Sequence, residues 1–341
     1  MSEASENPSS KLQFFPVMFF ASGMGIGGAG LVLQKITKVF DMSTFFHVIA
    51  GIVDVLSALV LVTVTVVYLR KVKNYWPEVK KELFHPMRIN FFAALAISTL
   101  IVQMLLESLH VPFGVLVAMF YFAALFQLFF SLHVIRYWFA AEIKQKMASP
   151  AWFVPIVGNI IVPVAASKLN AISAGTVPYE ISIFYFSMGS FFWIILAATL
   201  FNRLVFGESL PPKFVPTLFI FIAPPSIFGV SVTSLFEGMF DPHTLYVIAT
   251  ISFNVALFFA FLMIIFTPTF FRQKFAMSWW AYTFPMAAFS LCALELYHME
   301  HSHFYECVGI IGAILTILIV ATVAVRTLIG IRHTEICLLE E

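Results

Sequence analysis

The sequence predicts an all-α integral membrane protein, with ten transmembrane helices that form five repeated helical hairpins. The first observation behind this prediction is composition: 61% of the 341 residues are hydrophobic and only 11% are charged. Mean hydropathy is +0.95. A soluble fold of this size cannot hide so much apolar surface, so lipid must cover part of it.

The second observation is a series of ten apolar runs. About 20 apolar residues are enough to cross the hydrocarbon core as a helix. The ten helices are expected at 14–33, 44–69, 89–106, 112–135, 152–168, 180–202, 214–235, 244–266, 277–297 and 305–329. We therefore expect an N-terminal tail at 1–13, a ten-helix transmembrane domain at 14–330 and a C-terminal tail at 331–341.

The third observation is an internal repeat. Aromatic residues followed by a proline recur at intervals of 61 to 70 residues, at Pro16, Pro86, Pro155, Pro216 and Pro285. An arginine closes four of the even helices with nearly the same period, at Arg70, Arg136, Arg203 and Arg272. Such a regular period indicates copies of one unit. Each period holds two spans, which predicts one hairpin per unit.

The basic residues predict the orientation of the hairpins. Sixteen of the 19 lysines and arginines fall on the side that holds both termini, and only Lys35, Lys38 and Lys168 fall on the other. Cytoplasmic loops are rich in lysine and arginine. We expect both termini to be cytoplasmic and the protein to lie in the plasma membrane, which is the inner membrane of a bacterium.

The odd helices differ from the even helices in their prolines. Proline in a helix interior removes a backbone hydrogen bond and kinks the helix. In a bilayer such breaks are tolerated only where protein or water satisfies the freed groups. The odd helices are therefore expected to form an inner ring around an aqueous path, with the even helices as an outer wall. We expect no lysine or arginine inside any odd helix.

Two motifs at the starts of odd helices carry a family resemblance. The segments 85–92 (HPMRINFF) and 280–286 (WAYTFPM) resemble those of the TehA and plant guard-cell slow anion channel family, also called the tellurite-resistance/dicarboxylate transporter family. The resemblance implies a homotrimer in which each protomer has its own pore through the five inner helices. It also implies that a phenylalanine plugs this pore, and Phe284 occupies the matching position.

The candidate site follows from the odd helices and from this resemblance. Phe284 is the expected gate. The glycines of the first helix, such as Gly23 and Gly27, either allow close helix packing or line an opening. The pore-lining candidates are Gly23, Gly27, Phe92, Gly158, Asn159, Pro163, Pro224, Ser226 and Pro285.

Ionisable residues in or near the spans have other interpretations. Asp54 lies deep in an outer helix, where a polar contact to a neighbouring helix or protomer explains it better than a role in transport. Glu107, Glu237 and Glu306 share one offset from the proline of their unit and are expected near the outer ends of odd helices, where they would repel anions.

The turn with His298, His301 and His303 is either a metal site or a solvated turn. Its spacing matches no known zinc pattern, so we expect no metal.

Three functions remain open. The leading one is a passive anion channel for small monovalent anions such as chloride, nitrate and bromide. The second is a secondary carrier for C4-dicarboxylates or for oxyanions such as tellurite. The third is a membrane metalloenzyme, although no nucleotide loop or nucleophile elbow is present. We expect no enzyme activity, catalytic residue or cofactor, and no nucleic acid partner; the partners are the lipid bilayer, inorganic anions and two further copies of the chain.

Overall fold

A computed structural model describes residues 8–333 and 336–337 of the chain. Every regular element within these residues is a helix, which confirms the predicted all-α membrane fold class. The tails expected at 1–13 and 331–341 lie partly outside the described residues. The described part of the N-terminal tail forms the short helix α1, Pro8–Gln13.

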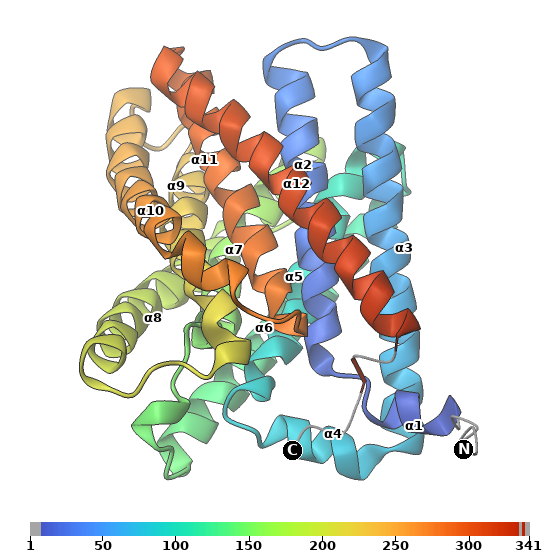
Figure 1. Cartoon of the computed structure of the whole chain (residues 1–341). Helices are drawn as coiled ribbons and strands as arrows, with labels where there is room; N and C mark the ends of the chain where they lie inside the picture. The colour runs from blue at the N-terminus through green and yellow to red at the C-terminus, as the bar shows by residue number, and fades with distance from the viewer. Residues whose placement is uncertain (1–7, 334–335, 338–341) are drawn as a thin grey trace.

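The long helices fall into two sets, which we call ring helices and wall helices. The ring helices are α2 Phe20–Val39, α5 Ala93–Leu106, α7 Phe153–Ile172, α9 Ala223–Leu235 and α11 Thr283–Glu300. The wall helices are α3 Thr44–Asn74, α6 Phe113–Ala140, α8 Tyr179–Phe206, α10 Pro242–Phe271 and α12 His303–Arg332. A short helix, α4 Trp76–Leu83, lies with α1 at one end of the bundle (Figure 1).

The ring helices close a circle, in which α2 packs on α5, α5 on α7, α7 on α9, α9 on α11, and α11 again on α2. Each wall helix packs on the ring helix before it in sequence and also on the next one, so that α3 lies against α2 and α5. Figure 1 shows α2 and α3 side by side as an antiparallel pair. That the five pairs are copies of one unit stays a prediction.

Burial separates the two sets in the same way. In their most apolar stretches, 72–89% of the residues are buried in the first four ring spans, against 28–39% in the wall spans. Large apolar side chains of the wall, such as Phe129, Phe258 and Leu318, are exposed on the outside of the bundle. Lipid is the solvent that suits such a surface.

Nine helices in the described part of the chain are long and apolar enough to cross a membrane. The tenth expected span, at 277–297, corresponds to α11 and the segment before it. This helix is less apolar because its last turns contain Glu295, His298 and Glu300. It packs against α2, α9, α10 and α12, so it is shielded by protein and has little need of a lipid-facing surface.

Each ring helix is directly preceded by a 3-10 segment. These segments are Val17–Phe19, Arg88–Phe92, Pro150–Trp152, Pro212–Ile222 and Met277–Tyr282. They contact one another in the same cyclic order as the ring helices. All five ring helices therefore start at one end of the bundle and run in the same direction.

The prolines act at this junction between 3-10 and α-helix. Pro155, Pro224 and Pro285 lie in the first turn of α7, α9 and α11. A proline is well tolerated in the first turn of a helix, because its fixed φ angle suits the start of a helix. The expectation that these prolines kink helix interiors is therefore wrong; among the described α-helices of the ring, only α7 has an interior proline, Pro163.

The glycines of α2 set the spacing where the first and last ring helices meet. A Cβ atom on Gly25 would lie 2.3 Å from Thr283 Oγ1 and 2.8 Å from Thr283 Cβ. A Cβ atom on Gly28 would lie 2.9 Å from the Cβ atom of Ala287. These distances are too short for any real side chain, so the interpretation of close helix packing holds for both positions.

Replacing Gly25 with alanine is expected to destabilise the protein by about 1–3 kcal/mol, because the new methyl group overpacks the contact with α11. The measurement is the midpoint of thermal unfolding in one detergent. Gly114→Ala in α6 is the matched control, because nothing lies within 4 Å of its Cβ position. Equal midpoints for the two variants would contradict this account of the contact.

A buried ion pair between Lys71 of α3 and Glu82 of α4 lies beside the segment that precedes α2. The Glu82 carboxylate accepts hydrogen bonds from Lys71 Nζ at 2.9 Å, Tyr68 OH at 2.7 Å and the Val17 N–H at 3.2 Å. Lys71 Nζ also donates to the Phe15 carbonyl at 2.7 Å. Side chains from α3 and α4 thereby bind the backbone just before α2 begins.

Candidate functional site

An apolar cavity of about 50 Å³ lies inside the ring. All five ring helices and three of the 3-10 segments before them contribute to its wall, and its surface is apolar throughout. A volume of this size admits only a few water molecules. Its lining consists of Ala21, Met24, Phe91, Ile97, Phe153, Val154, Val157, Gly158, Ile161, Ile220, Ala223, Ile227, Trp280, Ala281, Phe284 and Pro285.

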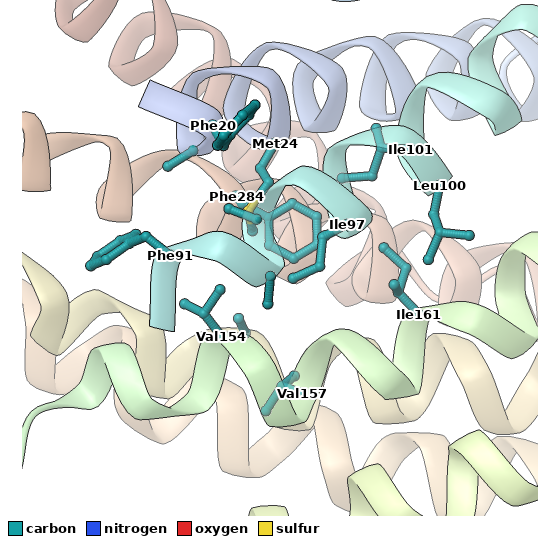
Figure 2. Close-up of a cluster of buried hydrophobic side chains, with 14 of the residues drawn as sticks. Phe20, Met24, Phe91, Ile97, Leu100, Ile101, Val154, Val157, Ile161 and Phe284 are labelled. Carbon is teal, nitrogen blue, oxygen red and sulfur yellow. The ribbon is translucent and has the colours of Figure 1, made fainter. Parts of the chain in front are cut away.

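Phe284 is the second residue of α11, directly after the 3-10 segment. Its side chain lies in the cavity wall with Met24 of α2 and Ile97 of α5, as Figure 2 shows. The absent side chain of Gly28 makes room for it, because a Cβ atom there would lie 3.4 Å from Phe284 Cδ2. The aromatic ring is 7% exposed and belongs to the central apolar cluster.

Phe289 belongs to the same helix but points away from the cavity. Its ring stacks on Phe253 of α10, with ring centroids 5.1 Å apart. It does not belong to the cavity lining. The two phenylalanines therefore separate the inner and outer faces of α11.

The structure places three of the ten predicted site residues in the cavity wall, namely Phe284, Gly158 and Pro285. The other seven residues do not belong to the cavity lining. A Cβ atom on Gly23 would lie 2.9 Å from Ser98 Oγ, and one on Gly27 would lie 2.5 Å from Ile101 Cγ2. Both glycines thus accommodate α5.

The aromatic and polar candidates contact wall helices or form a hydrogen bond to the backbone of their own helix. Phe92 stacks on Phe130 of α6, with ring centroids 5.2 Å apart. Asn159 Nδ2 donates to Ser131 Oγ of α6 at 2.9 Å. Ser226 Oγ donates to the Ile222 carbonyl at 2.7 Å.

The remaining two candidates are prolines of the ring. Pro224 lies in the first turn of α9. Pro163 lies inside α7, and its carbonyl accepts a hydrogen bond from Ser167 Oγ at 2.9 Å. Neither belongs to the cavity lining.

Sequence reasoning missed the aliphatic lining of the cavity. Met24, Ile97, Val154, Val157 and Ile161 contribute to it. Their spacing on α7, at positions 154, 157 and 161, marks one helical face. Because almost every position of these helices is apolar, this spacing alone did not distinguish a lining face from a packing face.

Three lysines lie within the last two turns of ring helices, where the sequence analysis expected no lysine. Lys35 and Lys38 belong to α2 and Lys168 to α7, so the prediction of no lysine or arginine inside any odd helix is wrong. The helices run further than the apolar runs, to Val39 and Ile172. Lys35 Nζ forms a salt bridge of 2.5 Å with Glu295 of α11.

A second cavity of about 420 Å³ lies at the opposite end, where the ring helices begin. Its wall includes Lys71, Lys81, Arg88 and Lys213, together with Glu78, Glu82, Ile336 and Cys337. Among these, Glu78 has its carboxyl pKa lowered by a hydrogen bond from Lys81. Burial raises the pKa of the Cys337 thiol to about 11, so it stays protonated at neutral pH.

Asp54 makes the structural contact that its position predicted. Its carboxylate accepts a hydrogen bond from Gln34 Nε2 of α2 at 2.7 Å. Ser108 Oγ approaches the same oxygen at 3.4 Å. The prediction of a polar contact to a neighbouring helix is confirmed.

The outer acids and the histidine turn have separate environments. Glu107 follows α5, Glu237 follows α9, and Glu306 lies in the first turn of α12. His303 Nδ1 lies 2.9 Å from Glu306 Oε2. Within residues 8–333 and 336–337, no three His, Cys, Asp or Glu residues gather as metal ligands.

A closed ring of membrane helices around an axial apolar cavity defines a membrane transport protein. The chain matches the voltage-dependent anion channel family over residues 14–328 and belongs to that family. This match confirms the resemblance inferred from the two motifs at the starts of the ring helices.

Relatives from plants and bacteria support this assignment. The chain is 28% identical over 328 residues to the S-type anion channel SLAH2 of Arabidopsis thaliana, with 93% of this chain and 58% of the relative covered. It is 26% identical over 288 residues to the guard cell S-type anion channel SLAC1 of the same plant, covering 82% and 49%. The identity to the tellurite resistance protein TehA homolog of Haemophilus influenzae is 25% over 287 residues, covering 83% and 81%. The chain thus spans about half the length of the plant relatives.

Proposed function

We propose that the chain is a passive anion channel, in which small monovalent anions such as chloride, nitrate and bromide pass through the ring of each protomer and Phe284 closes the way. The observation that carries this proposal is the axial cavity, because residues from all five ring helices line it and Phe284 lies in its wall. The anion channels among the relatives support the choice of anions.

Closure follows from the apolar character of the cavity. A hydrated ion loses its water shell in an apolar constriction without gaining new ligands, so a narrow apolar segment blocks conduction by dewetting. The cavity of about 50 Å³ has no room for a hydrated anion. In this proposal the described structure corresponds to a closed channel, and conduction needs Phe284 to move.

The basic residues at the two ends of the ring, which we call its mouths, support anions over cations. Lysines and one arginine line the cavity where the ring helices begin, and three further lysines lie where they end. Fixed positive charges raise the local concentration of anions. The apolar cavity between them has no fixed charge, which favours weak binding and fast passage.

The proposed assembly is a homotrimer in the plasma (inner) membrane with both termini in the cytoplasm. The orientation is supported by the excess of basic residues where the ring helices begin. In such an assembly each protomer conducts independently, because the cavity is built from residues of one chain.

The bi-ionic reversal potential tests the proposed selectivity. If backbone amides and mouth lysines attract anions only weakly, then ease of dehydration decides which anion passes. Nitrate and bromide are therefore expected to permeate at least as well as chloride, and divalent sulfate poorly. A reversal potential that shows cation preference, or sulfate above chloride, would overturn the proposal.

A secondary carrier for C4-dicarboxylates or oxyanions such as tellurite is the second candidate. The lysines within α2 and α7 favour it, because a carrier for carboxylates needs a cation in its path. They lie in the last turns of these helices rather than at mid-membrane, which favours the channel. Saturable counterflow of succinate in liposomes without single-channel current would select the carrier.

A further inference from the structure

The ring helices end in a charged cluster at the end of the bundle opposite α1 and α4. Its members are Lys35 and Lys38 of α2, Lys168 of α7, Glu295 of α11 and Glu107, which directly follows α5. Lys168 is within electrostatic range of each of the other four. We call these five residues the outer cluster.

Helical geometry places three members of the outer cluster on the same faces as the cavity lining. Lys35 follows Met24 by 11 residues, and Glu295 follows Phe284 by 11 residues; Lys168 follows Ile161 by seven residues. Eleven residues make about three turns and seven make about two, so each side chain returns to the face from which it was counted. The outer cluster therefore lies above the cavity along the same axis.

The direction of the ring helices makes this end unfavourable for anions. Five parallel helices present their C-terminal ends here, and each such end carries a partial charge of about −0.5. Glu107 and Glu295 add further negative charge. An anion pathway through the ring therefore needs compensating cations at this mouth.

One of the two lysines on these faces already forms a salt bridge. Lys35 is paired with Glu295 at 2.5 Å. Lys168 is exposed at the mouth, and within the described part of the chain no hydrogen bond or ion pair within 4.0 Å involves it. α7 packs on α5 and α9, and Lys168 is also within electrostatic range of Lys35 on α2 and Glu295 on α11, the two remaining ring helices.

We propose that Lys168 is the anion-attracting residue of the outer mouth, which binds a small monovalent anion weakly before it enters the ring. This inference rests on the proposed channel function and deepens it. Lys168 determines the preference for anions over cations at this mouth. Its positive charge offsets the negative charge of the helix ends and of the two glutamates, which would otherwise favour cations.

The test compares nitrate currents of Lys168→Gln, Lys168→Arg and Lys73→Gln, all in the Phe284→Ala background. Lys73 is an exposed residue of the last turn of α3, at the opposite end of the bundle, so Lys73→Gln removes the same charge as a control. Currents are recorded in excised patches with nitrate at about 10 mM and at about 1 M. The Debye length falls from about 30 Å to about 3 Å between these concentrations.

Lys168→Gln is expected to lower the nitrate current at least about threefold at the lower concentration and to leave it unchanged at the higher one, since local attraction of counter-ions by one charge is screened by salt. Lys168→Arg is expected to match the reference at both concentrations. The result that overturns the inference is a Lys168→Gln current equal to that of Lys73→Gln at about 10 mM. A loss that persists at about 1 M and in Lys168→Arg overturns it as well, because it indicates a structural role. A reference protein without any anion current would instead overturn the proposed function, and this inference with it.

Discussion

Replacing Phe284 with alanine is expected to raise the anion current at least about tenfold, since removal of about 1.4 kcal/mol from a barrier changes a rate by that factor. The physical reason is that the aromatic side chain of Phe284 lies in the wall of a cavity that has no polar surface. Phe284→Leu keeps part of the apolar volume and should give an intermediate current. Single-channel recording of purified protein in planar bilayers measures the effect.

Phe289→Ala is the matched control for this experiment. It removes the same side chain from the same helix, but its ring packs on Phe253 of the wall rather than in the cavity. The control is expected to lose stability, since a buried aromatic side chain is removed, and to conduct like the parent. If Phe289→Ala opens the pore while a stable Phe284→Ala assembly does not, the assignment of the gate is wrong.

Replacing Glu82 with alanine is expected to destabilise the protein by about 3–5 kcal/mol, because it leaves Lys71 as an unpaired buried charge. The side chains of Lys71 and Glu82 are only 3% and 4% exposed. The hydrogen bonds to Tyr68 and to the Val17 N–H are lost together with the ion pair. The measurement is thermal or denaturant unfolding of detergent-purified protein.

The neighbouring pair between Glu78 and Lys81 provides the control on the same short helix. Lys81 is 69% exposed, so Glu78→Ala should cost less than about 1 kcal/mol. Glu82→Gln removes only the charge of the side chain, and its stability should lie between those of Glu82→Ala and the parent. Similar losses for Glu78→Ala and Glu82→Ala would show that burial does not control the strength of the pair.

The division into ring and wall could be predicted from the sequence because the two sets differ in chemistry. Prolines and small polar residues concentrate in the helices that lipid does not reach, and the repeat indicated which helices these are. The role of the prolines was misjudged for a local reason. Spans estimated from apolar runs do not reveal the 3-10 segments, and these segments place Pro155, Pro224 and Pro285 in first turns.

The candidate site was predicted less completely. Phe284 stood out because a specific motif surrounds it, and the structure places it in the cavity wall. Whether positions 23, 27, 92 and 159 face the cavity or a neighbouring helix depends on how the helices pack, and the sequence pattern does not show this packing. Lys168 was placed at the last residue of an expected span, because the apolar run ends before the helix does.

The contact between α2 and α11 has a consequence for how the protein is made. Gly28 of α2 and Phe284 of α11 lie where the first and last ring helices pack together, although 256 residues separate them in the chain. During synthesis α3 and α5 can pack on α2 early, but its other side has no partner until α11 and α12 have been made. Until then the glycine face of α2 is exposed to lipid, to water or to an insertion factor. The ring of helices is therefore completed only when α11 and α12 have been made, in a step that also covers the glycine face.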